Sequence, residues 1–336
     1  MRIESLVRII DGELLNFPSI TYIDQLKTDP KKIKRADAFI CKNDNQKDIE
    51  NAIHSGAYAI ISEKKLQITD NEIAWINVDS IEKAIIRYLR YKTIQLESRF
   101  FLCDSVTYEI LKSISFSKDI LFLNDDVFDN FYSIVNAGNN TIFICKNKKI
   151  VNDIYPAYLN IDNPETNFIK VIKNSLFLSD FIYKDMYYQD IKIPYIFIKQ
   201  LNKSLKFLEK FSLEFSLNNL SVKNHFYPIF VDNLFRIQDF GQTSKVLIEE
   251  TDELLIEEEL KYLKTNAKYA KISLLLPKNF TNISTDIDIY KYDSFYDIIN
   301  ITKKDYNFFL IFNKEKIGIF SFLKEMKQIG NERSLF

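Results

Sequence analysis

The sequence predicts an α/β protein made of three α/β units in series. Its 336 residues are too many for one small domain and suit two or three domains with apolar cores of their own. Short apolar runs also alternate with amphipathic segments in three successive stretches of the chain, which is typical of α/β units. We therefore expect domains at residues 1–95, 96–238 and 239–336.

The first unit shows the alternation most clearly. Ser80 is suited to cap a helix, and apolar side chains follow it at helical spacing over 81–89. The unit is predicted to be compact, with strands at 38–41, 59–62 and 73–78 and helices at 46–55 and 80–92.

The second unit begins with the apolar run 99–103, and later runs at 120–123 and 141–145 predict further strands of a parallel sheet. From about 161 to 215 the pattern is mainly helical. An apolar stripe in that stretch indicates core packing, and its members are Phe197, Leu201, Leu205, Leu208 and Phe211.

The third unit again reads as βαβ units. Asp252 precedes an amphipathic segment and is suited to cap it. The expected strands are 243–249, 272–276, 287–290 and 308–312, and the expected helices are 253–265 and 317–326.

Glycine is scarce, and this excludes two nucleotide-binding motifs. The chain has six glycines, and they stand at Gly12, Gly56, Gly138, Gly241, Gly318 and Gly330. A Walker loop or a dinucleotide fingerprint needs glycines a few residues apart, so that backbone N–H groups can close on phosphate oxygens. Neither motif is present.

The overall charge gives no sign of a nucleic-acid or anionic-membrane partner. The 45 basic and 46 acidic residues nearly cancel. Three distant cysteines in apolar runs predict buried thiols rather than disulfides or metal pairs, at Cys41, Cys103 and Cys145. With charges throughout the N-terminus and no apolar run of about 18 residues, we expect a cytoplasmic protein without a membrane span.

The stretch from Thr28 to Ser62 resembles the N-terminal domain of the Mur ligases, closest to the members that add D-alanyl-D-alanine. In that family an Asp-Ser-Arg motif precedes a Gly-Asp-x-Phe strand and a helix that ends in Gly-Ala. Residues at matching positions here are Asp29, Lys31, Asp37, Phe39, Gly56 and Ala57. The resemblance implies a UDP-muramyl precursor as ligand, with Asp29, Lys31 and Asp37 as the candidate binding residues.

The same resemblance implies that the ATP site has been lost. The family's central domain opens with a strand, T-G-S-x-G-K-T-T and a helix, but here the strand leads through Cys103-Asp104-Ser105-Val106 directly into the helix. The family's magnesium-binding glutamate follows a later strand, where this chain has Lys146-Asn147-Lys148. We therefore expect no catalytic residues, no cofactor and no metal site, within a shortened and degenerate central domain.

Other polar residues have simple structural interpretations. Glu249 and Glu250 are expected near a helix N-terminus, where acids are stabilised, and Glu257–Glu259 on a solvated face. Asn124–Asp126 with Asp129 is expected to cap a helix rather than to bind a cation. His54 is expected on a helix surface, and His225 in a polar turn without partners.

Taken with the resemblance, these features favour a non-catalytic Mur-ligase-like protein that serves as partner or regulator in peptidoglycan precursor synthesis or cell-shape control. Its expected partner is a cytoplasmic protein of cell-wall synthesis or cell shape. Two alternatives stay open, namely a divergent ligase and a sensor that binds a UDP-muramyl precursor.

Overall fold

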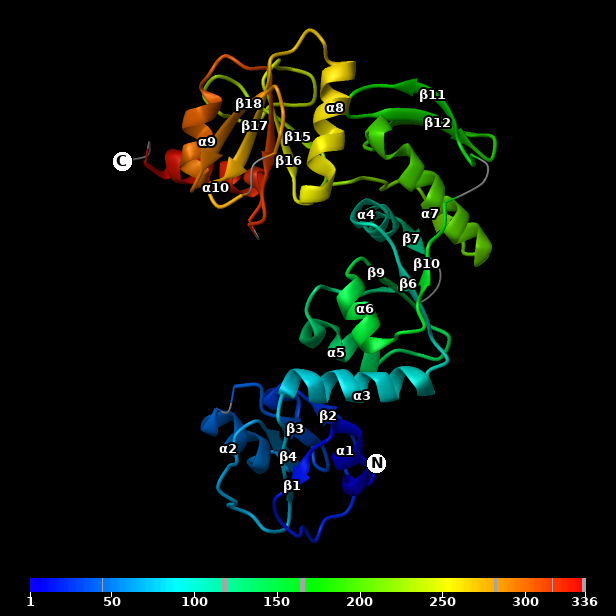
Figure 1. Cartoon of the computed structure of the whole chain (residues 1–336), viewed down its shortest axis with the longest axis vertical. Coiled ribbons are helices and arrows are strands. Elements are labelled where there is room, and N and C mark those ends of the chain that lie inside the picture. Colours follow the sequence, from blue (N-terminus) through cyan, green and yellow to red (C-terminus); the bar gives the residue numbers. More distant parts are fainter. Residues whose placement is uncertain (44, 117–119, 164–166, 281–282, 316, 334–336) are drawn as a thin grey trace. The chain divides into compact units, whose positions relative to one another are not determined.

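The computed structural model describes residues 1–43, 45–116, 120–163, 167–280, 283–315 and 317–333. They form two compact units, of which unit 1 contains 1–103 and 119–160, and unit 2 contains 104–118 and 161–336. Both units combine helices with parallel sheets (Figure 1), so the predicted α/β fold class is confirmed. The expected domain boundaries near residues 95 and 238 stay a prediction.

Unit 1 contains two sheets. The first has the order β1-β5-β4-β3-β2, in which only β1 is antiparallel, and the second has the parallel order β10-β6-β9-β8. The strands are β1 (Glu13–Leu14), β2 (Leu26–Lys27), β3 (Ala38–Ile40), β4 (Ala59–Ser62), β5 (Ala74–Asn77), β6 (Arg99–Leu102), β8 (Ile120–Phe122), β9 (Ile142–Cys145) and β10 (Leu159–Asn160). The helices are α1 (Ile3–Ile10), η1 (Pro30–Lys32), α2 (Gln46–His54), α3 (Ile81–Gln95), α5 (Val127–Val135) and α6 (Lys148–Ile154).

The first sheet is buried on both faces, which explains its nearly continuous apolar strands. Successive side chains of a strand point to opposite faces, and accordingly Ala38 and Ile40 pack into one hydrophobic cluster while Phe39 packs into another. Helix α3 contacts α1 as well as α5 and α6 (Figure 1). Ser80 caps α3 through the backbone N–H of Lys83, as predicted.

Unit 2 is built around a five-stranded sheet of order β15-β16-β19-β17-β18, in which only β15 is antiparallel. Its strands are β15 (Tyr227–Phe230), β16 (Val246–Glu250), β17 (Ile272–Pro277), β18 (Asp288–Tyr292) and β19 (Phe308–Phe312). The helices that follow these strands are η3 (Glu253–Leu255), α8 (Ile256–Asn266), α9 (Phe295–Thr302) and α10 (Ile319–Arg333).

The remaining part of unit 2 departs from expectation, because the stretch 161–215 is not mainly helical. It forms a three-stranded antiparallel sheet from β11 (Lys170–Asn174), β12 (Ser179–Tyr183) and β13 (Met186–Ile191). The predicted apolar stripe is nevertheless confirmed, since Leu201, Leu205 and Leu208 are buried on one face of a helix. Further elements are α4 (Ser105–Ser113), β7 (Ser115–Phe116), η2 (Tyr195–Phe197), α7 (Ile198–Lys210) and β14 (Phe215–Ser216).

Helix α4 belongs to unit 2 although the strands before and after it, β6 and β8, belong to unit 1. Within unit 2 it contacts α7, and β7 pairs with β14. The three cysteines are buried thiols, as predicted. Over the described ranges, no helix combines the length and the apolar character that crossing a membrane requires.

Candidate functional site

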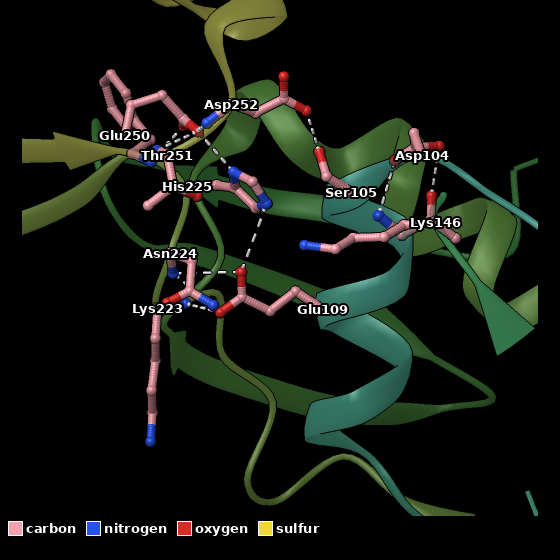
Figure 2. Close-up of polar contacts among 12 residues, drawn as sticks. Asp104, Ser105, Glu109, Lys146, Lys223, Asn224, His225, Glu250, Thr251 and Asp252 are labelled. Atoms are coloured by element: carbon pink, nitrogen blue, oxygen red, sulfur yellow. Dashed lines mark hydrogen bonds and ion pairs between the residues drawn. The ribbon is translucent and has the colours of Figure 1, made fainter. Parts of the chain in front are cut away.

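A buried polar cluster in unit 2 surrounds His225, which lies just before β15 and is only 4% exposed. Its Nδ1 lies 2.7 Å from Glu250 Oε1, and its Nε2 lies 3.7 Å from Glu109 Oε2. Figure 2 shows the imidazole between the two carboxylates. The prediction of a partnerless histidine in a polar turn is therefore wrong, because two acids from distant segments enclose it.

Glu250 ends the buried strand β16 and has no exposed surface. Besides His225, three backbone N–H groups donate to it, from Phe226 at 3.0 Å, Thr251 at 2.7 Å and Asp252 at 2.6 Å. Oε1 accepts the N–H groups of Thr251 and Asp252, and Oε2 accepts that of Phe226. Because Oε1 already accepts from backbone N–H groups, we assign a hydrogen to the facing Nδ1 of His225, which then acts as the donor.

Glu109 extends from α4 toward the residues that precede β15. Its Oε1 accepts hydrogen bonds from the backbone N–H groups of Lys223 at 2.6 Å and Asn224 at 2.9 Å. Burial raises the pKa of Glu109, against the opposing effects of the His225 charge and these hydrogen bonds. Glu109 thus joins α4 to the residues that precede β15 (Figure 2).

The two glutamates decide the charge of the histidine. Burial by itself lowers the pKa of His225, but the hydrogen bond to Glu250 and the negative charges of Glu250 and Glu109 outweigh it, so that this pKa is raised. The two carboxylates therefore stabilise the positive form of the imidazole relative to the neutral form.

A further acid, Glu259 on α8, is fully buried. Neither of its carboxyl oxygens has a hydrogen-bond partner within the described part of the chain. Burial, followed by the nearby charge of Glu250, raises the pKa of Glu259 well above its ordinary value. The prediction that Glu257–Glu259 lie on a solvated face is therefore confirmed for Glu257 and Glu258, which are exposed. It is wrong for Glu259.

The N-terminus of α4 is occupied by protein carboxylates. Asp104 caps the helix through the backbone N–H of Thr107 at 2.7 Å, and Lys203 from α7 donates to the same carboxylate at 3.0 Å. Ser105 donates to Asp252 Oδ2 at 2.6 Å. Burial by itself raises the pKa of Asp104, but the bonds from Thr107 and Lys203 outweigh it, so this pKa is lowered.

At the N-terminus of α4 the chain places a carboxylate where phosphate-binding loops place the ligand. In phosphate-binding loops the helix N-terminus is open to the ligand, with a loop lysine on the phosphates and a hydroxyl on magnesium. Here an ionised aspartate holds that position and satisfies both a helix N–H and the nearby Lys203. Phosphate oxygens placed there would meet a like charge.

In unit 1, the residues after β9, where the family has its magnesium-binding glutamate, make other contacts. After β9, Lys146 pairs with Asp125 at 3.4 Å, and Asn147 caps α6 through Lys149 and Ile150. Asp126 caps α5 as predicted. Among the residues that the structure describes, no three His, Cys, Asp or Glu side chains are grouped so that they could hold a metal ion.

The three candidate precursor-binding residues are partly used by the fold itself. Asp29 caps η1 through the N–H of Lys31 at 3.0 Å, while the buried Asp37 accepts from the N–H groups of Lys34 at 2.9 Å and Gln25 at 3.3 Å. Lys31 is exposed. Their assignment to a precursor stays a prediction.

Glu249 corrects another expectation. Together with Glu250 it was expected near the start of the following helix, but both are the buried last residues of β16. Glu249 accepts from Asn313 Nδ2 at 2.7 Å and from the N–H of Ile319 at 3.0 Å. It therefore stabilises the start of α10 rather than that of α8, and Asp252 caps η3, the short helix that leads into α8.

A cavity of about 530 Å³ lies where β17, β18 and β19 end, at Pro277, Tyr292 and Phe312. Open α/β sheets bind ligands at the carboxyl ends of their strands. The lysines that line this cavity are already neutralised within the protein, since Lys278 pairs with Asp293 and Lys314 pairs with Glu253.

Solved structures with a similar fold are Mur ligases. MurF from Acinetobacter baumannii matches with a TM-score of 0.56 and 9% identity, over 97% of this chain and 98% of that chain. The MurF ligase from Thermotoga maritima, solved in complex with ADP, matches with a TM-score of 0.53 and 12% identity, over 90% of this chain and 98% of that chain. At such low identity these matches show the fold alone, and they confirm that it is Mur-ligase-like. No known protein family matches the sequence, and no curated protein matches it.

Proposed function

We propose that this chain is a non-catalytic Mur-ligase-like protein that acts in the cytoplasm as partner or regulator in peptidoglycan precursor synthesis or cell-shape control. The observation that supports this most is Asp104, whose carboxylate caps α4 and pairs with Lys203 where the sequence resemblance expects a phosphate-binding loop. A protein that keeps a ligase fold without its nucleotide site is suited to bind other components rather than to form a bond.

The first test is nucleotide binding. We expect no heat of binding with Mg-ATP at millimolar concentration, and no ligase turnover with a UDP-muramyl peptide and D-alanyl-D-alanine, because like charge and missing donors oppose the phosphates. Isothermal calorimetry with a MurF ligase as positive control measures the first, and phosphate release measures the second.

The variant Asp104→Asn distinguishes a nucleotide site that the Asp104 carboxylate obstructs from a nucleotide site that the chain lacks. We expect it to bind no ATP either, since it lacks the loop glycines and lysine as the natural chain does. Micromolar Mg-ATP affinity in the natural chain would favour a divergent ligase. Affinity that appears only in Asp104→Asn would mean that the nucleotide site is intact and merely obstructed.

A second test concerns the precursor. A ligand that binds only the folded state raises the melting temperature by mass action. With Asp29 and Asp37 already bonded within their own loops, we expect little or no shift with UDP-muramyl peptides. A saturable shift that Asp29→Ala or Lys31→Ala abolishes would instead support the precursor sensor.

A further inference from the structure

Helix α4 and the segment 223–226 are held together by carboxylates from two sides. Glu109 accepts the backbone N–H groups of Lys223 and Asn224, and Glu250 accepts that of Phe226. The ring of His225 lies between the same two carboxylates, at 2.7 Å and 3.7 Å. One segment of four residues therefore connects α4 to the end of β16 (Figure 2).

The protonation of His225 decides whether this connection is attractive. Because Glu250 accepts from Nδ1, a neutral ring would point the lone pair of Nε2 at the Glu109 carboxylate. A protonated ring points an N–H at that oxygen instead. The pair between His225 and Glu109 is thus favourable only when the ring carries its second proton.

The other charged groups around the ring reinforce this dependence. Negative groups come from α4 and from β16 and its following turn, while Lys203 is paired with Asp104 and Lys223 faces solvent. The negative groups are Glu109, Glu250 and Asp252. Helix α8 adds Glu259, whose pKa is raised well above its ordinary value, and the exposed Glu258 beside it. Apart from His225, no buried cation in the described part of this cluster faces Glu109.

We propose that Glu109, His225 and Glu250 form a proton-dependent latch, which holds α4 and segment 223–226 against the end of β16 while His225 is protonated and loosens them when it becomes neutral.

The latch has a structural consequence beyond α4. Val222, Lys223 and Phe226 line a cavity of about 770 Å³ whose other walls come from β13, β15 and the residues around Phe240. Because the latched segment forms one wall, loosening it changes the shape of this cavity. The pH at which the latch opens is then also the pH at which the cavity is remodelled.

The two histidines of the chain make the test direct. His54 is exposed and serves as an internal reference, while His225 is buried. In an NMR titration of the full chain with labelled histidine, we expect His225 to keep its proton above the ordinary histidine pKa of 6.5. His225→Gln identifies the signal by removing it, and His54→Gln leaves it unchanged.

Hydrogen exchange of the full chain measures the opening itself. The closed state raises the His225 pKa above its ordinary 6.5, so the latch is complete below pH 6.5 and is lost as pH rises through the closed-state value. In that window, protection factors of amides in 105–113 and 222–226 should fall by up to about tenfold per pH unit. His54→Gln should show the same fall.

Glu109→Gln keeps the shape of the side chain and removes its charge. We expect lower protection at pH 6 than in the natural chain and a shallower loss as pH rises, because the imidazolium has lost one of its two anions. Titration of His225 at or below pH 6.5 overturns the latch. Protection of α4 that does not change with pH, in a chain whose His225 does titrate, overturns it as well.

Discussion

Removal of the Glu250 carboxylate by Glu250→Ala should destabilise unit 2 by roughly 3–5 kcal/mol, the range found when one partner of a buried charged pair is deleted. The carboxylate is fully buried and accepts from His225 and from three backbone N–H groups, all of which the substitution leaves without this acceptor. Urea unfolding followed by far-UV circular dichroism measures the loss.

A matched control lies in the same unit. Glu257 is exposed on α8, so Glu257→Ala should change the free energy of unfolding by no more than about 0.5 kcal/mol. The chain's single tryptophan, Trp75, lies in β5 of unit 1, so its fluorescence does not report on unit 2. A loss below about 1 kcal/mol for Glu250→Ala would show that this carboxylate does not organise the cluster.

Local apolar patterns predicted the central strands well. The strands β4 at 59–62 and β19 at 308–312 have the bounds that their uninterrupted apolar runs predict. Such runs are typical of parallel strands buried on both faces, and both strands are buried along their whole length. Where burial is this complete, the sequence pattern alone determines the element.

The antiparallel sheet of unit 2 was missed because its turn has an unusual sequence. β12 and β13 are joined by Lys184 and Asp185, which have φ angles of 48° and 63°. Tight hairpin turns with positive φ are usually marked by Asn-Gly or Asp-Gly. Neither dipeptide occurs in this turn. Both faces of β11 and β13 are also partly exposed, so their sequences show no regular alternation of apolar and polar residues that would indicate strands.

The buried cluster was missed for a different reason, because its contacts are distant in sequence. Glu109 bonds to a residue 114 positions away, and His225 to one 25 positions away. The neighbours Lys223 and Asn224 are exposed, so the local sequence looked like a solvated turn. One signal was present, namely two acids at the end of the apolar run 246–248, which become buried if the strand extends through them.

Replacement of Glu259 should stabilise the protein, unlike the loss of Glu250. Glu259 is fully buried, its oxygens meet no partner at hydrogen-bonding distance among the described residues, and its main electrostatic neighbour is the Glu250 carboxylate. A buried unsatisfied polar group costs about 1–3 kcal/mol. We expect Glu259→Leu to raise the free energy of unfolding by about that amount near pH 8.

The pH dependence of the free energy of unfolding distinguishes removal of a buried carboxyl group from a simple improvement in packing. Burial and the charge of Glu250 raise the folded-state pKa of Glu259 above its ordinary 4.5, so the folded state binds this proton more tightly than the unfolded state does. The contribution of Glu259 to stability is therefore complete below pH 4.5 and is lost as pH rises through the raised value.

Glu259→Gln does not titrate, so its stability relative to the natural chain should grow with pH across that window. Glu258→Gln, an exposed change on the same helix, is the control, and its stability is compared with that of the natural chain at each pH. If the stability of Glu259→Gln instead follows that of the natural chain at every pH, a partner stabilises the Glu259 carboxyl group in the folded state. Its removal then brings no gain in stability.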